Sequence, residues 1–145
     1  MVSIKKEYLK MLHQAAWINR VMLAIVYIWF GYLKVIGTSP AEGLVAELFQ
    51  ITLSGTISVN LFIKILGLFE CVLGFVWLVP NFSKIAFYLL VFHLLTTFLP
   101  IILLPAITWT TFMSLSLVGQ YIIKNVVIFS SAYFIYRFSL VGSYL

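Results

Sequence analysis

Glu70 is the residue of this 145-residue sequence with the most potential for chemistry, because it lies about twelve residues into a long apolar run. His93 lies about ten residues into the next run. With about 1.5 Å of rise per helical residue, both side chains belong near the middle of a membrane. An ionised side chain there costs at least about 2.5–3.5 kcal/mol, so it requires a partner or a function.

Two interpretations of Glu70 are open. It could form a buried hydrogen bond that fastens two helices, to His93 or to a Lys or Arg that reaches along the bundle. It could instead bind a ligand or handle protons, and His93 could relay a proton. The second interpretation is favoured slightly, because an ionisable residue is a costly way to make a hydrogen bond.

Four basic residues are further candidates for a polar site. Lys34, Lys64 and Lys124 lie in the halves of their runs expected on the outer side of the membrane. Basic residues of membrane proteins are usually enriched on the cytoplasmic side instead. For Lys34, at the end of its run, we expect a snorkelling side chain. Lys64 and Lys124 are as consistent with snorkelling as with a cationic vestibule for an anionic headgroup or a small anion. Arg20 is expected to anchor its helix by facing lipid phosphates.

No catalytic residues are predicted. The single cysteine, Cys71, excludes an internal disulfide and a CxxC pair. Two histidines and four acidic residues, widely dispersed, predict no metal site. Haem ligation by His93 is disfavoured, because His13 precedes the first apolar run. No Ser-His-Asp set or phosphate-binding glycine loop occurs.

The composition indicates a membrane protein. Hydrophobic residues make up 63% of the chain, charged residues 9%, and the mean hydropathy is +1.13. Soluble domains average about 45–50% apolar and about 25% charged residues. The net charge of +5 is spread thinly, without a basic face, so nucleic acid is not an expected partner. The length predicts a single domain, residues 1–145.

Four apolar runs are long enough to cross a bilayer as helices, which takes about 20 residues each. The sequence therefore predicts an all-α membrane protein, a bundle of four transmembrane helices. The runs cover about residues 17–36, 58–79, 83–104 and 117–138.

Each run has one stripe of polar or small residues, and we expect all four stripes to face inward. The stripes are Arg20, Ala24, Tyr27, Gly31 and Lys34; Gly67, Glu70 and Gly74; Ala86, His93, Thr97 and Pro100; and Gln120, Lys124 and Ser131.

The segment between the first two runs predicts a short amphipathic helix over about residues 40–53. Ser39 and Glu42 have the spacing of a capping box, with Pro40 at the first helical position. Apolar residues then recur at helical spacing, as expected for a helix that lies at the outer membrane surface or covers the bundle. The apolar loop from Pro105 to Ser116 is expected to dip into the membrane interface.

Basic residues predict the orientation. Most of them flank the first run, the turn after the second and the end of the fourth, so both termini should be cytoplasmic, in a bacterial inner membrane. Trp17 and Trp77 are expected at the inner interface and Trp109 at the outer one.

The chain resembles the DoxX-like family of small four-helix membrane proteins, over about residues 20–138. The matching segments are RVMLAIVYIWFGYLKV (20–35) and LGLFECVLGFVWLVPNFSKIAFYLLVFHLL (66–95), and GQYIIKNVVIFSSAYFIY (119–136) resembles a subgroup with a lysine in the last helix. The resemblance gives weight to Arg20, Gly31, Lys34, Glu70 and Gly74.

The family takes its name from small subunits of thiosulfate:quinone oxidoreductase. The resemblance therefore implies a non-catalytic accessory subunit of a membrane complex, respiratory or quinone-linked, whose polar site holds a quinone or lipid headgroup or docks another integral membrane subunit. Two alternatives stay open. One is a small transporter for an anion or a protonated solute, assembled as a homo-oligomer. The other is a membrane assembly factor.

Overall fold

The computed structural model describes residues 2–142, with the side chains of residues 6–141. Within that part of the chain, four helical segments are long and apolar enough to cross a membrane: Lys6–Val35, Val59–Trp77, Pro80–Leu103 and Leu117–Val141. The four predicted runs are thereby confirmed, and the chain has the architecture of a helical membrane protein. The helices and strands are α1 (Val2–Val35), α2 (Glu42–Thr52), α3 (Val59–Trp77), the 3-10 turn η1 (Pro80–Phe82), α4 (Ser83–Leu103), α5 (Pro105–Thr108), β1 (Trp109–Thr111), β2 (Ser114–Leu115), α6 (Leu117–Ile123) and α7 (Asn125–Gly142).

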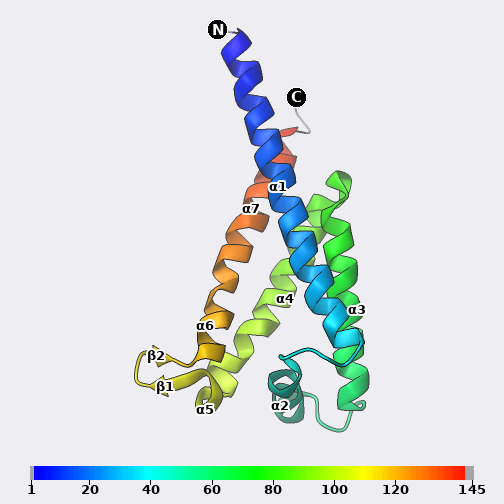
Figure 1. The fold of residues 1–145 in the computed structure, drawn as a ribbon, viewed down its shortest axis with the longest axis vertical. Coiled ribbons are helices and arrows are strands. Elements are labelled where there is room, and N and C mark those ends of the chain that lie inside the picture. The colour runs from blue at the N-terminus through cyan, green and yellow to red at the C-terminus, as the bar shows by residue number, and fades with distance from the viewer. Residues whose placement is uncertain (1, 143–145) are drawn as a thin grey trace.

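The spans run alternately up and down the bundle, as Figure 1 shows. The start of α1, the turn between α3 and α4, and the end of α7 lie at one end, which we call the basic end because it carries Lys84 and Arg137. The opposite end carries α2, α5 and the β1–β2 hairpin. α1 packs along α3, and α7 packs against both α1 and α4.

The buried core lies between these helices and includes the fully buried Leu73, Trp77, Leu90 and Ile135. Many large apolar side chains point outward instead; Trp29, Phe75, Phe92 and Ile102 are examples. An outer surface this apolar fits lipid contact or contact with other membrane helices, but not water.

The start of α1 differs from its predicted boundary, whereas the ends of α3 lie within two residues of the predicted ones. α1 begins at Val2, about fifteen residues before the predicted start at 17, because the polar leader continues the same helix. α3 begins where Ser58 accepts a hydrogen bond from the Leu61 amide, and it ends before Pro80. The N-cap bond supplies a partner for an amide that the helix itself leaves unpaired.

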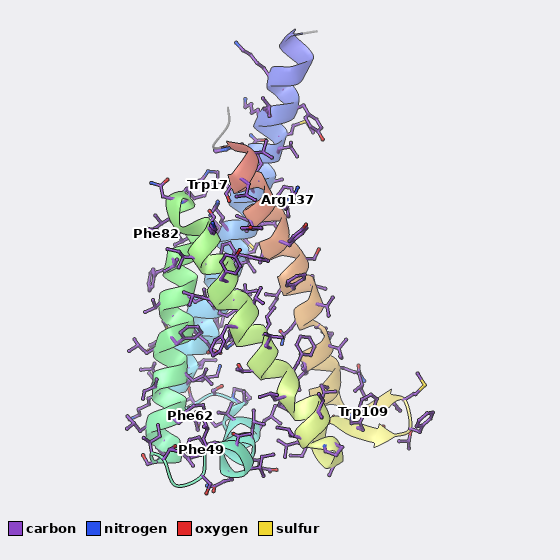
Figure 2. The ribbon with its side chains drawn as sticks, turned by 180° about the vertical axis from the view of Figure 1, so that it is seen from behind. Trp17, Phe49, Phe62, Phe82, Trp109 and Arg137 are labelled. Carbon is purple, nitrogen blue, oxygen red and sulfur yellow. The ribbon has the colours of Figure 1, made fainter. Side chains whose placement is uncertain are left out.

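A helix is also present between α1 and α3, within the predicted range 40–53. The Glu42 carboxylate accepts a hydrogen bond from the Ser39 amide at 2.9 Å, as one half of a capping box does. The apolar face of α2 packs on α3 through Phe49, which is buried and stacks at a tilt on Phe62 with ring centroids 4.9 Å apart. Figure 2 shows both phenylalanines at the end away from Trp17.

The fourth span departs from the prediction. It is broken at Lys124 into α6 and α7, and it is preceded by a two-stranded hairpin in which Met113 has a φ of 58°. Its polar stripe does not face inward, because Gln120 and Lys124 are exposed and only Ser131 is half-buried. Ala132 and Ile135 form the buried face instead. Trp77, which was predicted at the inner interface, is the last residue of α3, and its side chain is fully buried in the core.

Candidate functional site

The inward face of α1 is the one that the sequence predicts. Arg20, Ala24, Tyr27, Gly31 and Lys34 are all buried. They recur at spacings of three and four, which places them on one stripe of the helix. The stripe faces α3, whose Gly67, Glu70 and Gly74 are buried as predicted.

Two glycines let the backbones of α1 and α3 approach closely. A Cβ atom on Gly67 would lie 2.6 Å from the Gly31 carbonyl oxygen, and one on Gly31 would clash with the Gly67 carbonyl oxygen. Small residues are typical of such crossings in membranes, where backbone proximity increases van der Waals contact. The crossing brings the polar residues that follow each glycine, Lys34 and Glu70, within reach of each other.

Glu70 lies at the centre of a buried network. Its Oε2 atom pairs with Lys34 Nζ at 2.6 Å, and its Oε1 atom lies 3.0 Å from His93 Nε2. The side chains of Lys34 and Glu70 are only 8% and 6% exposed. We call Lys34, Glu70, His93 and Tyr27 the Glu70 network, because Tyr27 Oη lies 3.4 Å from His93 Nδ1. Three spans, α1, α3 and α4, therefore meet at one carboxylate.

If Lys34 and Glu70 are both charged, hydrogen-bond counting assigns the hydrogens of this network. An ionised carboxylate can only accept, so His93 Nε2 must carry the hydrogen that points at Glu70. A neutral His93 then has a free acceptor at Nδ1, and the Tyr27 hydroxyl donates to it. In that state the four groups have no net charge. One added proton fits at His93 Nδ1, provided that the Tyr27 hydroxyl changes from donor to acceptor.

The snorkelling expected for Lys34 is wrong. Side chains on a helix point toward its N-terminus. For α1 that direction leads from the end carrying α2 into the bundle. The Lys34 ammonium accordingly lies 3.5 Å from the Phe30 carbonyl oxygen, one turn back, and beside Glu70. The carboxylate supplies the charge that burial of the ammonium requires.

Arg20, which was expected to anchor its helix by facing lipid phosphates, is buried inside the bundle and is not exposed on its outer surface. Arg20 is 4% exposed, and its partners lie on either side of the turn between α3 and α4. It donates to the Trp77 carbonyl oxygen at 3.1 Å and to Ser83 Oγ at 2.6 Å. The guanidinium thus joins the last residue of α3 to the first residue of α4.

The lysines do not converge into a vestibule, which was one of the two interpretations left open for Lys64 and Lys124. Lys64 on α3 and Lys124 between α6 and α7 are both exposed, and neither pairs with an acid among the residues whose side chains are described. Lys124 instead lies over the Tyr121 ring, 4.7 Å from its centroid. Lys34 alone of the three joins the polar centre.

Sequence reasoning did not assign a role to Tyr27 or Ser83. Tyr27 could have been found, because it lies on the Arg20–Lys34 stripe with its hydroxyl directed to the same interior. Ser83 carries no signal of its own, since its partner Arg20 is 63 residues away.

The Glu70 network connects three helices through the contacts of one carboxylate. No group of three or more His, Cys, Asp or Glu side chains in the described part of the chain is arranged to hold a metal ion. Comparisons with protein-family models, curated proteins and solved structures found no match to this chain.

Proposed function

We propose that this chain is a non-catalytic accessory subunit of a larger membrane complex, and that the Glu70 network stabilises the packing of its spans. The observation that supports this proposal most directly is that both carboxylate oxygens of Glu70 are occupied by side chains of the same chain. A carboxylate engaged in this way serves packing better than substrate binding.

The proposal places the basic end in the cytoplasm of a bacterium, with α2 at the outer face of the inner membrane. The distribution of charge supports it, since Lys84 and Arg137 lie at the basic end while Glu42 and Glu47 lie on α2. The apolar outer faces of the spans would contact lipid and other integral membrane subunits.

A respiratory, quinone-linked role is part of the proposal and rests on the resemblance to the DoxX-like family. In that role the partner subunits would supply the redox cofactors, and this chain would contribute a surface for a quinone or a lipid headgroup. The subunit composition of the purified sample tests whether the chain belongs to a complex. The small molecules bound to the same sample test whether it holds a quinone or a lipid.

Native mass spectrometry of the tagged full chain, purified in mild detergent from its own membrane, tests the proposal. We expect one complex of fixed stoichiometry with other integral membrane proteins. Glu70→Ala should lose that complex, while Glu47→Ala, at an exposed site on α2, should retain it. A monomer or a homo-oligomer alone would contradict the proposal, and association with a client that is missing from the finished complex would indicate an assembly factor.

A second candidate is proton-coupled transport. The unbroken chain of contacts from Lys34 through Glu70 and His93 to Tyr27 favours it, because each step lies between 2.6 and 3.4 Å. Proton flux into proteoliposomes, followed with an entrapped pH dye, should then disappear in Glu70→Gln and persist in Glu47→Gln. Equal flux in both variants would remove Glu70 from any proton path.

A further inference from the structure

A cavity of about 1040 Å³ opens at the basic end of the bundle, far from the Glu70 network. Its polar lining comes from three different spans and includes Arg20 of α1, Lys84 of α4 and Arg137 of α7. Figure 2 shows Arg137 and Trp17, which also lines the cavity, at this same end.

The side chains that the structure describes do not balance the charge of the cavity. No acidic side chain in the described part of the chain pairs with Arg20, Lys84 or Arg137. Glu7 is the acidic residue on the same stretch of chain, and it lies thirteen positions before Arg20, about 20 Å along the helix. Within the described residues, three cations therefore line one cavity without an ion-paired acid.

Arg20 makes this imbalance costly, because it is almost fully buried. Its two hydrogen bonds go to neutral oxygens and use two of the five guanidinium donors. The carboxyl end of α3 compensates only part of the charge, since a helix end carries about half an elementary charge. A buried cation in this position favours an anion from outside the chain.

The start of α4 adds to the same preference. Pro80, Asn81, Ser83 and Lys84 line the cavity, and no side chain caps the first turn of α4. The amide groups at a helix start can attract an anion. The first of them, on Ser83, already donates to the Pro80 carbonyl oxygen, so this contribution is smaller than that of the cations.

Most of the remaining lining is apolar, with His13 and Ser139 as its polar members. Leu9 and Leu12 of α1 and Phe134 and Phe138 of α7 belong to this apolar part. A cationic site beside an apolar wall matches an amphiphile whose head is an anion and whose tail is hydrocarbon. Free phosphate would satisfy the cations but not the apolar wall.

We propose that this cavity binds an anionic phospholipid, with its phosphate at Arg20, Lys84 and Arg137 and an acyl chain along the leucines and phenylalanines. The inference is independent of the accessory-subunit proposal, because it concerns a different end of the molecule and other residues. It requires neither a partner subunit nor a proton path.

The test is native mass spectrometry of the full chain titrated with phosphatidylglycerol, phosphatidylcholine or inorganic phosphate. The wild-type protein should retain phosphatidylglycerol at least tenfold more tightly than phosphatidylcholine. Inorganic phosphate should not displace the lipid at equal concentration. Loss of selectivity, or displacement by inorganic phosphate, would overturn the proposal.

A matched pair of double variants locates the site. Lys84→Gln with Arg137→Gln removes two exposed cations from the cavity, whereas Lys64→Gln with Lys124→Gln removes two exposed cations elsewhere. Each cation near a lipid phosphate contributes a several-fold affinity gain, so the first pair should weaken phosphatidylglycerol binding by on the order of 30-fold. The second pair should change it less than threefold. An equal effect of the two pairs would show nonspecific charge attraction and would refute the assigned site.

Discussion

Arg20 and Lys34 are two cations on the same face of the same helix, and both are more than nine-tenths buried. Lys34 meets a carboxylate at 2.6 Å, whereas Arg20 meets two neutral oxygens. The difference indicates that the mid-bundle site is complete within the chain, while the site at the basic end requires a charge from outside. A buried cation can thus belong either to an ion pair that stabilises helix packing or to a binding site, and its partners distinguish the two.

Replacing Glu70 by Ala should have the largest effect, because it leaves Lys34 as a buried and uncompensated charge. Removal of one partner from a buried ion pair costs about 3–5 kcal/mol of unfolding free energy. Thermal unfolding of the purified protein in detergent measures this loss. Glu47→Ala, at an exposed position, should stay within about 0.5 kcal/mol of the wild type, and an equally small effect of Glu70→Ala would remove the distinction between the two cations.

Replacing Arg20 by Met should cost less, about 1.5–3 kcal/mol, because hydrogen bonds to a charged group are lost but no charge is left behind. The same unfolding assay applies. If Arg20→Met destabilised the protein more than Glu70→Ala, the hydrogen bonds of Arg20 to neutral oxygens would contribute more to the unfolding free energy than the charge of Glu70 does. That order is the reverse of the one expected here.

Adding a Cβ at Gly31 tests how the mid-bundle site is assembled. Gly31→Ala should cost about 1–3 kcal/mol, because α1 and α3 must separate and the Lys34–Glu70 contact must lengthen. Gly43→Ala is the control, since no heavy atom lies within 4 Å of a Cβ there. Equal unfolding temperatures for the two variants would mean that the close crossing of α1 and α3 does not position the pair.

The smallest effect is expected at His93. Replacement by Phe removes a hydrogen bond to Glu70 but leaves the Lys34–Glu70 pair, so the loss should be near the average of about 0.6 kcal/mol for bonds between membrane helices. Chemical unfolding in mixed micelles can resolve it. A loss as large as that of Glu70→Ala would make His93, and not Lys34, the essential partner of the carboxylate.

The sequence predicted the inward face of α1 correctly because two independent constraints agree there. Helical spacing places Arg20, Tyr27 and Lys34 on one stripe, and the cost of polar groups in lipid turns that stripe inward. The same reasoning named His93 as one of the possible partners of Glu70, beside a Lys or Arg, and the structure has both His93 and Lys34 in contact with the carboxylate.

The fourth span could not be predicted in the same way. Gln120 and Lys124 follow helical spacing, but the helix breaks at Lys124 and both side chains lie outside the core. A long lysine side chain near a span end can keep its charge at the membrane surface, so its position in the sequence does not fix the direction in which it points.

Lys34 and the basic cavity depend on information that local sequence does not contain. The direction of the Lys34 side chain follows from the polarity of α1 in the membrane, together with the glycine contact that brings α3 near. The cavity at Arg20 joins residues from the first, third and fourth spans, and its lack of an acid becomes evident only when those spans are placed together.

A double-variant cycle on Lys34 and Glu70 tests the central claim most directly. Unfolding free energies would be measured for Lys34→Met, Glu70→Met and the pair together. Because the double variant leaves no buried charge unpaired, it should be more stable than either single variant, with a coupling energy of at least about 1 kcal/mol. Additive losses in the double variant would show that Glu70 does not neutralise Lys34. That result would contradict the proposal that the Lys34–Glu70 pair stabilises the packing of the spans.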